Sequence, residues 1–157
     1  MATQNFQYAG TQGGGGVTPA TRTFAVASGG TSAISIGDIV VCSAGYAAKV
    51  ADAGMASPGK FGLAVSTSTD TASAAGSVDV MYCPAGLLVN GTLSTSASQS
   101  NVFAGFKIAV AAGVQKVDLG NSGVATLTAV GAPGTQSSIV ANAVTLTQGL
   151  IALPWAV

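Results

Sequence analysis

Apolar and polar residues alternate in short runs along most of this 157-residue chain. Alternation with a period of two places one face of each run on a core and the other in solvent, as in a β-strand. Gly-, Ser- and Thr-rich segments separate the runs and mark turns. The runs lie at residues 22–26, 32–36, 39–42, 46–50, 61–65, 78–82 and 140–146. The pattern predicts an all-β fold, a compact sandwich or barrel of about ten short strands.

The segment Leu87–Leu93 contains the strongest local turn signal of the chain, Asn90-Gly91 between apolar residues. Both residue types readily adopt the positive φ angles of a type I′ turn. The sequence predicts a β-hairpin that reverses at Asn90-Gly91.

The second half of the chain resembles the first. Gly37 and Gly45 enclose seven residues, as do Gly105 and Gly113, and each segment leads to a Lys-Val pair. Gly105 follows Gly37 by 68 residues (105 − 37). This spacing suggests two related β units of about 65 residues, with lobes at 21–93 and 94–157. The alternative is that glycine-bounded hairpins look alike in any β protein. Residues 100–114 could be read as a helix, but their glycines and β-branched residues favour a strand.

Residues 1–20 are expected to form a flexible, glycine-rich N-terminal arm. The run Gly13–Gly16 loses much backbone entropy on ordering and disfavours a packed element. Phe6 and Tyr8 are apolar anchors on this arm, which suggests docking onto a partner. The alternative is a frayed terminus.

Charged residues make up only 6% of the chain, against about a quarter in ordinary soluble domains. There is no histidine, and five cations balance five aspartates, most of which are placed to form turns. These residue types supply acid–base catalysts and metal ligands, so we expect no enzyme, no metal and no cofactor. Without a basic patch or a long apolar segment, we expect neither nucleic acid nor membrane as a partner. A neutral surface lacks the repulsion that keeps copies apart.

Two further features concern buried or interface groups. Cys42 and Cys83 lie in apolar stretches, and the sequence favours two buried free thiols over a disulfide. The chain ends on an apolar segment that contains Leu153 and Trp155. Trp155 closes the core of its own domain or packs at a subunit interface. Phe6, Tyr8, Leu153 and Trp155 are therefore the candidate contacts with a larger partner or with another subunit.

Four segments together resemble a known family: Gly37-Asp38-Ile39-Val40-Val41, Ala48-Lys49-Val50, Gly59 to Val65, and Ala75 to Val80. Their order, a Gly-Asp apolar run, a short hairpin, G-x-x-G-x-A and G-x-V-x-V, resembles the capsid decoration (cement) proteins of tailed bacteriophages. The resemblance covers roughly residues 37–80. It implies a structural virion protein on the capsid surface, assembled in the host cytoplasm, with the major capsid protein and copies of itself (a dimer or trimer) as partners.

The resemblance and the low charge lead to the same expectation. Such a protein would bind the outer surface of the phage capsid and stabilise the mature shell. A head fibre or tail protein is the nearest alternative. A β-sandwich module that binds glycans through Tyr8, Tyr46, Tyr82 and Trp155 is a further one.

Overall fold

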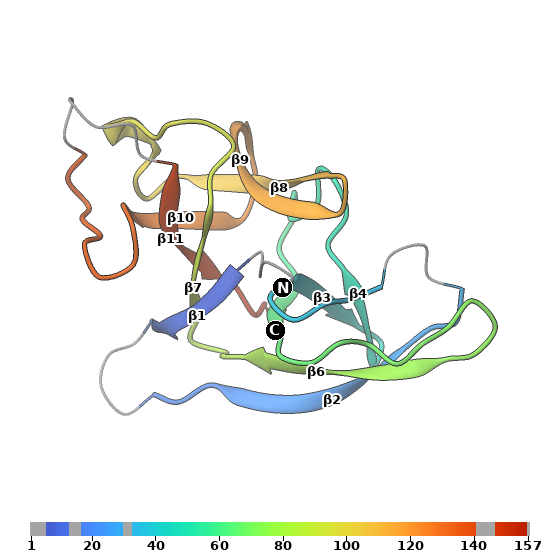
Figure 1. Ribbon diagram of the computed structural model, residues 1–157. Coiled ribbons are helices and arrows are strands. Elements are labelled where there is room, and N and C mark those ends of the chain that lie inside the picture. The colour runs from blue at the N-terminus through green and yellow to red at the C-terminus, as the bar shows by residue number, and fades with distance from the viewer. Residues whose placement is uncertain (1–5, 13–16, 30–32, 141–146, 157) are drawn as a thin grey trace.

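The computed structural model describes residues 6–12, 17–29, 33–140 and 147–156. These residues form eleven strands and one short 3-10 helix, so the all-β prediction is confirmed. The elements are β1 (Phe6–Thr11), β2 (Ala20–Val26), β3 (Ile39–Ser43), β4 (Tyr46–Lys49), β5 (Lys60–Ala64), β6 (Gly76–Tyr82), β7 (Leu87–Thr92), η1 (Gln99–Asn101), β8 (Gly105–Ala111), β9 (Val114–Ser122), β10 (Ala125–Val130) and β11 (Gln148–Leu153). Figure 1 shows β8 to β11 gathered on one side of the molecule and β2 and β6 on the other.

Strands β2 to β6 close into a barrel with the order β2-β4-β3-β5-β6. All neighbours are antiparallel except β2 and β4, which are parallel and pair only at Ala25 and Tyr46. Strands β3 and β4 form an antiparallel hairpin that reverses at Ala44-Gly45 with φ angles of 52° and 84°. We call this barrel the first lobe.

The other strands form a six-stranded sheet, the second lobe, with the order β1-β7-β11-β10-β8-β9. An isolated parallel bridge between Leu93 and Val117 connects β9 back to the end of β7. Apart from β1, the second lobe has the same strand neighbours and the same strand directions as the first. Strands β7, β8, β9, β10 and β11 correspond to β2, β3, β4, β5 and β6, in that order. The division falls between Tyr82 and Leu87, earlier than the expected boundary at residue 93.

Local details support this correspondence between the lobes. The β8–β9 hairpin reverses at Ala112-Gly113 with φ angles of 51° and 78°, as the first-lobe hairpin does at Ala44-Gly45. Before β3, the Gly37 N–H donates to the Ala64 carbonyl oxygen; before β8, the Phe103 N–H donates to that of Leu127. Both Gly37 and Phe103 have positive φ angles, 92° and 65°. The structure therefore aligns Gly37 with Phe103, and not with Gly105 as the spacing suggested.

The predicted hairpin at Asn90-Gly91 is wrong, because β7 passes straight through these residues. Asn90 pairs with Gln7 on one side and with Leu150 on the other. A Cβ at Gly91 would collide with the ring of Phe6. Glycine is thus needed here for the close approach of an aromatic ring, not for a turn.

The N-terminal segment differs from the expected arm. Residues 6–11 form edge strand β1, which pairs with β7, and Phe6 is 1% exposed in the core. Burial of a phenylalanine side chain offsets the ordering of this segment. The run Gly13–Gly16 lies outside the described residues.

The predicted strand at residues 32–36 is wrong within the described residues. Residues 33–35 are irregular, although Ile34 is buried, and β2 pairs with β6 instead of with this segment. Of the predicted strand at 140–146, only Val140 lies within the described residues, and it is not in a strand.

The lobes share a hydrophobic core. One cluster of buried residues fills the barrel, and a larger one runs from the second lobe onto the outer face of β3 and β5, where Ile39 and Leu63 belong to it. Gln115 of β9 is 0% exposed and lies at this junction. Its amide binds the backbone of Ile39 and Val50 through three hydrogen bonds.

Candidate interaction surface

The few acidic side chains mainly hold the chain's own backbone. Three aspartates accept hydrogen bonds from backbone N–H groups: Asp38 from Ser35, Asp52 from Val110 and Asp118 from Gly120. Asp38 is 1% exposed and lies 3.2 Å from the Lys49 ammonium. Asp38 and Asp118 thus cap local backbone as predicted, whereas Asp52 connects the first lobe to the second. Within the described ranges, no group of three His, Cys, Asp or Glu side chains could hold a metal ion.

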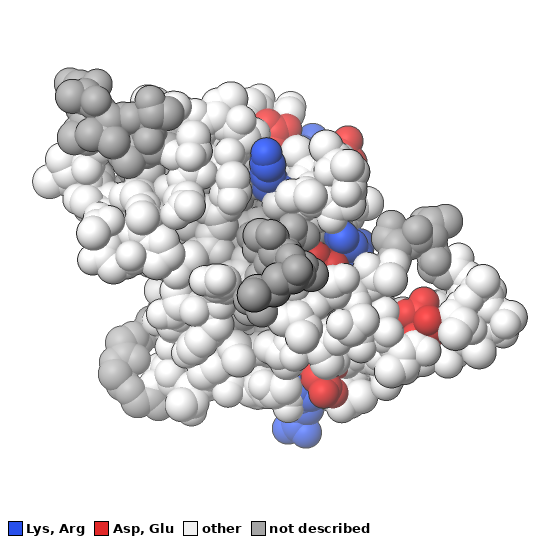
Figure 2. Space-filling view, in the orientation of Figure 1, with Lys and Arg blue, Asp and Glu red and all other residues white. Residues whose placement is uncertain are grey.

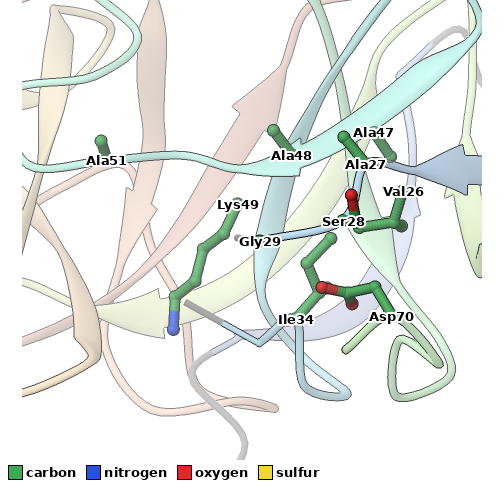
Figure 3. Close-up of a pocket in the computed structure, with 10 residues that line it drawn as sticks. All are labelled: Val26, Ala27, Ser28, Gly29, Ile34, Ala47, Ala48, Lys49, Ala51 and Asp70. Carbon is green, nitrogen blue, oxygen red and sulfur yellow. The ribbon is translucent and has the colours of Figure 1, made fainter. Parts of the chain in front are cut away.

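A hollow of about 310 Å³ lies beside the barrel, lined by residues of β4, the end of β2 and the following loop, Ile34 and Asp70 (Figure 3). Asp70 Oδ1 is buried there without a hydrogen-bond partner. The only cation of the lining, Lys49, donates to the Gly113 carbonyl oxygen and is paired with Asp38. Among the described lining residues, Asp70 is the only carboxylate and Lys49 the only cation.

Phe24, Tyr82 and Trp155 form an aromatic cluster on the barrel. The rings of Tyr82 and Trp155 are stacked with centroids 4.1 Å apart, and Phe24 lies 6.3 Å from Tyr82 and 6.4 Å from Trp155. The segment around Trp155 pairs with the start of β5, since the Phe61 N–H donates to the Pro154 carbonyl oxygen. Trp155 packs against the barrel core, so it closes its own domain, and all three rings stay half-buried.

The most exposed large apolar side chains lie on two loops of the second lobe. Ile139 is 77% exposed and Phe103 is 70% exposed. Gln99 of η1, four residues before Phe103, connects the loops: its amide donates to the Ser138 carbonyl oxygen and accepts from the Val140 N–H. We call Phe103, Ile139 and Gln99 the loop patch.

Phe103 is the unusual member of the loop patch. Its φ of 65° costs an ordinary L-residue about 1–2 kcal/mol, and the corresponding residue in the first lobe is a glycine. With 70% of its surface in solvent, the side chain gains little burial in this chain to offset that strain. The exposed ring and the strained backbone together make Phe103 a candidate binding residue.

The predicted contact residues lie in different places. Phe6 and Leu153 are buried in this chain's core, at 1% and 0% exposure, and have no surface to offer to a partner. Trp155 is half-buried in the aromatic cluster. Tyr8, on the outer strand β1, is 44% exposed and keeps a surface. No local pattern in the sequence distinguishes Phe103, because this residue lies in an apolar stretch that reads as core.

Charged side chains are few on the surface. Figure 2 shows one face of the molecule, on which a few Lys, Arg and Asp side chains interrupt an otherwise uncharged surface. No helix in the described part of the chain is long and apolar enough to cross a membrane. No protein-family model matches the chain, and neither the curated proteins nor the solved structures include a significant match to it.

The two cysteines are free and buried, as predicted. Burial raises the pKa of the Cys42 thiol to about 11, and the positive charge of Lys60 opposes this rise. A value about two units above the ordinary one lowers the thiolate fraction at pH 8 about 100-fold. We expect Cys42, measured in a Cys83→Ala variant, to react with an aromatic disulfide reagent at pH 8 about 100-fold more slowly in the folded protein than in urea.

The same shift predicts a pH dependence of stability. Between the ordinary pKa and about 11, the unfolded chain has lost the Cys42 proton and the folded chain still holds it. The contribution of Cys42 to the free energy of unfolding is therefore complete below the ordinary pKa and is lost as the pH rises toward 11.

In the labelling experiment, equal rates for the folded and the unfolded protein at pH 8 would show that Cys42 is not buried in solution.

Proposed function

We propose that this chain is a structural virion protein that binds the outer surface of a bacteriophage capsid and stabilises the mature shell. The resemblance of residues 37–80 to capsid decoration proteins suggests this role. The observation that carries it furthest is Phe103, an exposed ring held at a strained φ in a chain with little charge. An aromatic side chain of this kind is suited to fill a pocket on a large apolar or neutral partner.

Weak binding of each copy is enough to stabilise a capsid shell. A ligand that binds only the expanded lattice stabilises that lattice by mass action. Because many copies bind one head, each interface can be weak while the total is large. With so few charges, binding should depend little on salt.

Two alternative functions, a head fibre or tail protein and a glycan-binding module, fit the observations less well. A head fibre or tail protein would have the same low charge, and it would assemble into rings, tubes or long trimers on its own. For a glycan module, the four aromatic side chains would need to converge. Tyr82 and Trp155 instead stack on each other, while Tyr8 and Tyr46 lie on separate strands, β1 and β4.

The proposal is tested by sedimenting expanded heads, prepared without this protein, from mixtures with the purified chain. We expect the wild-type protein to pellet with the heads at both low and high salt. Phe103→Asn should bind roughly 10-fold more weakly or worse, because the ring is lost. Asparagine tolerates a positive φ, so the same variant should be more stable by about 1 kcal/mol.

The matched control is Tyr46→Ser, which removes a 51% exposed aromatic ring from the first lobe. This variant should bind as the wild type does. If Phe103→Asn binds as well as the wild type, the loop patch is not the contact. Wild-type protein left wholly in the supernatant contradicts the proposed function itself.

A further inference from the structure

One edge of strand β2 is open. β6 pairs with β2 along its whole length, from Ala20 to Val26. On the other edge, β4 pairs with β2 only at Ala25, so no strand of the described residues covers Ala20 to Phe24 there. Residues 21–23 are exposed, and Figure 1 shows β2 along the rim of the molecule.

The backbone groups on this edge can be assigned. The Ala25 N–H donates to the Gly45 carbonyl oxygen, on the β4 side. Along a strand, successive N–H and C=O groups point to alternate edges, and the β2–β6 register has no bulge. The N–H and C=O groups of Thr21 and Thr23 therefore point to the open edge.

The second lobe contains the same edge in a covered form. β7 corresponds to β2, and the Leu93–Val117 bridge corresponds to the single β2–β4 pair. Next to that bridge, β1 of this chain covers β7 by antiparallel pairing from Leu87 to Gly91. In the second lobe, one additional strand, β1, thus pairs with this edge of β7. In the first lobe, no described strand pairs with the corresponding edge of β2.

The open edge has little of the protection that edge strands usually carry. Proteins block such edges with charges, prolines or bulges. Between Ala20 and Phe24 the only charged residue is Arg22, and Pro19 precedes the strand.

We propose that the open edge of β2 binds the same edge of a second copy of this chain, as an antiparallel pair about a two-fold axis. A two-fold contact needs only one self-complementary edge, and β1 of each copy is already used by its own β7. The near absence of charge lets two copies approach. A two-fold axis at Arg22 would place the Arg22 side chains of the two copies directly opposite each other, and their like charges would repel. The axis therefore passes through Thr21 or Thr23.

This inference does not rest on the capsid role, and it is tested on the protein alone. We expect light scattering of the full chain at about 100 μM to give twice the chain mass of 15.0 kDa. Thr21→Pro removes an N–H that points away from β6, so the barrel persists and the dimer is lost. Thr21→Ala, which keeps the N–H, should remain dimeric.

A second measurement holds even if the proline variant fails to fold. Under oxidising conditions, Thr21→Cys or Thr23→Cys should give a disulfide-linked dimer in high yield. Ser73→Cys, a control in an exposed loop, should give little. The proposal is overturned by a single-chain mass for the wild type, by a three-chain mass, or by equal cross-linking of all three variants. A monomeric wild type whose Thr21→Pro variant loses only head binding would assign the edge to a capsid strand instead.

Discussion

Replacing Gln115 with leucine should lower the free energy of unfolding by about 4 kcal/mol. The Gln115 amide accepts a hydrogen bond from the Ile39 N–H at 2.8 Å and donates to the carbonyl oxygens of Ile39 and Val50, each at 3.0 Å. Leucine has a similar volume and leaves two buried backbone groups, the Ile39 N–H and the Val50 carbonyl oxygen, without these partners, whereas the Ile39 carbonyl oxygen still accepts from the Val50 N–H. Each unsatisfied group costs about 1–3 kcal/mol.

Urea unfolding followed by circular dichroism measures this effect. Gln148→Leu is the matched control, because Gln148 is exposed on β11, and it should change stability by less than about 0.5 kcal/mol. If the two variants unfold at the same urea concentration, Gln115 does not connect the lobes in solution.

Replacing Phe6 with alanine should be about as severe, with a loss of about 3–5 kcal/mol. The Phe6 ring is 1% exposed and lies against Gly91, so its removal leaves a cavity between β1 and β7. Thermal unfolding measures the loss, and Tyr8→Ala on the same strand is the control. Tyr8 is 44% exposed, and its replacement should cost less than about 1 kcal/mol.

This pair of variants also decides between the strand and the arm that the sequence suggested. A flexible arm makes no contribution to folding, so Phe6→Ala would then unfold with the wild type. We expect instead a clear difference between the two variants, because burial and not glycine content determines where this segment lies.

The sequence was sufficient for features that depend on nearby residues. Apolar alternation located β5 and β6, and the Ala-Gly pairs at 44–45 and 112–113 end runs that become hairpins. The suggested duplication finds a counterpart in the matching strand order of the lobes. These features follow from local backbone preference and from which face of a strand is buried.

Features that depend on distant residues could not be predicted. Asn90-Gly91 has the local preference of a turn, but the ring of Phe6, 85 residues earlier (91 − 6), needs the space beside Gly91. The polar residue Gln115 reads as a solvent-facing position in β9, yet it is buried because its partners come from the other lobe. Tertiary packing overrides local preference in both cases.

The candidate site was the least predictable part. Phe6 and Leu153 are apolar residues near the ends of the chain, which makes them candidate contacts in the sequence, but both belong to the core of the fold. Phe103 lies in an apolar stretch that reads as core, and its positive φ and 70% exposure depend on the folded structure. Ile139 lies in a Ser-rich loop where periodicity carries no information.

The most direct measurement of the proposed role is an image reconstruction of expanded heads with and without this protein. We expect additional density at repeated positions outside the shell, each part matching one chain of 15.0 kDa, with the second lobe toward the capsid. Identical reconstructions, at protein concentrations well above those of the heads, would contradict it.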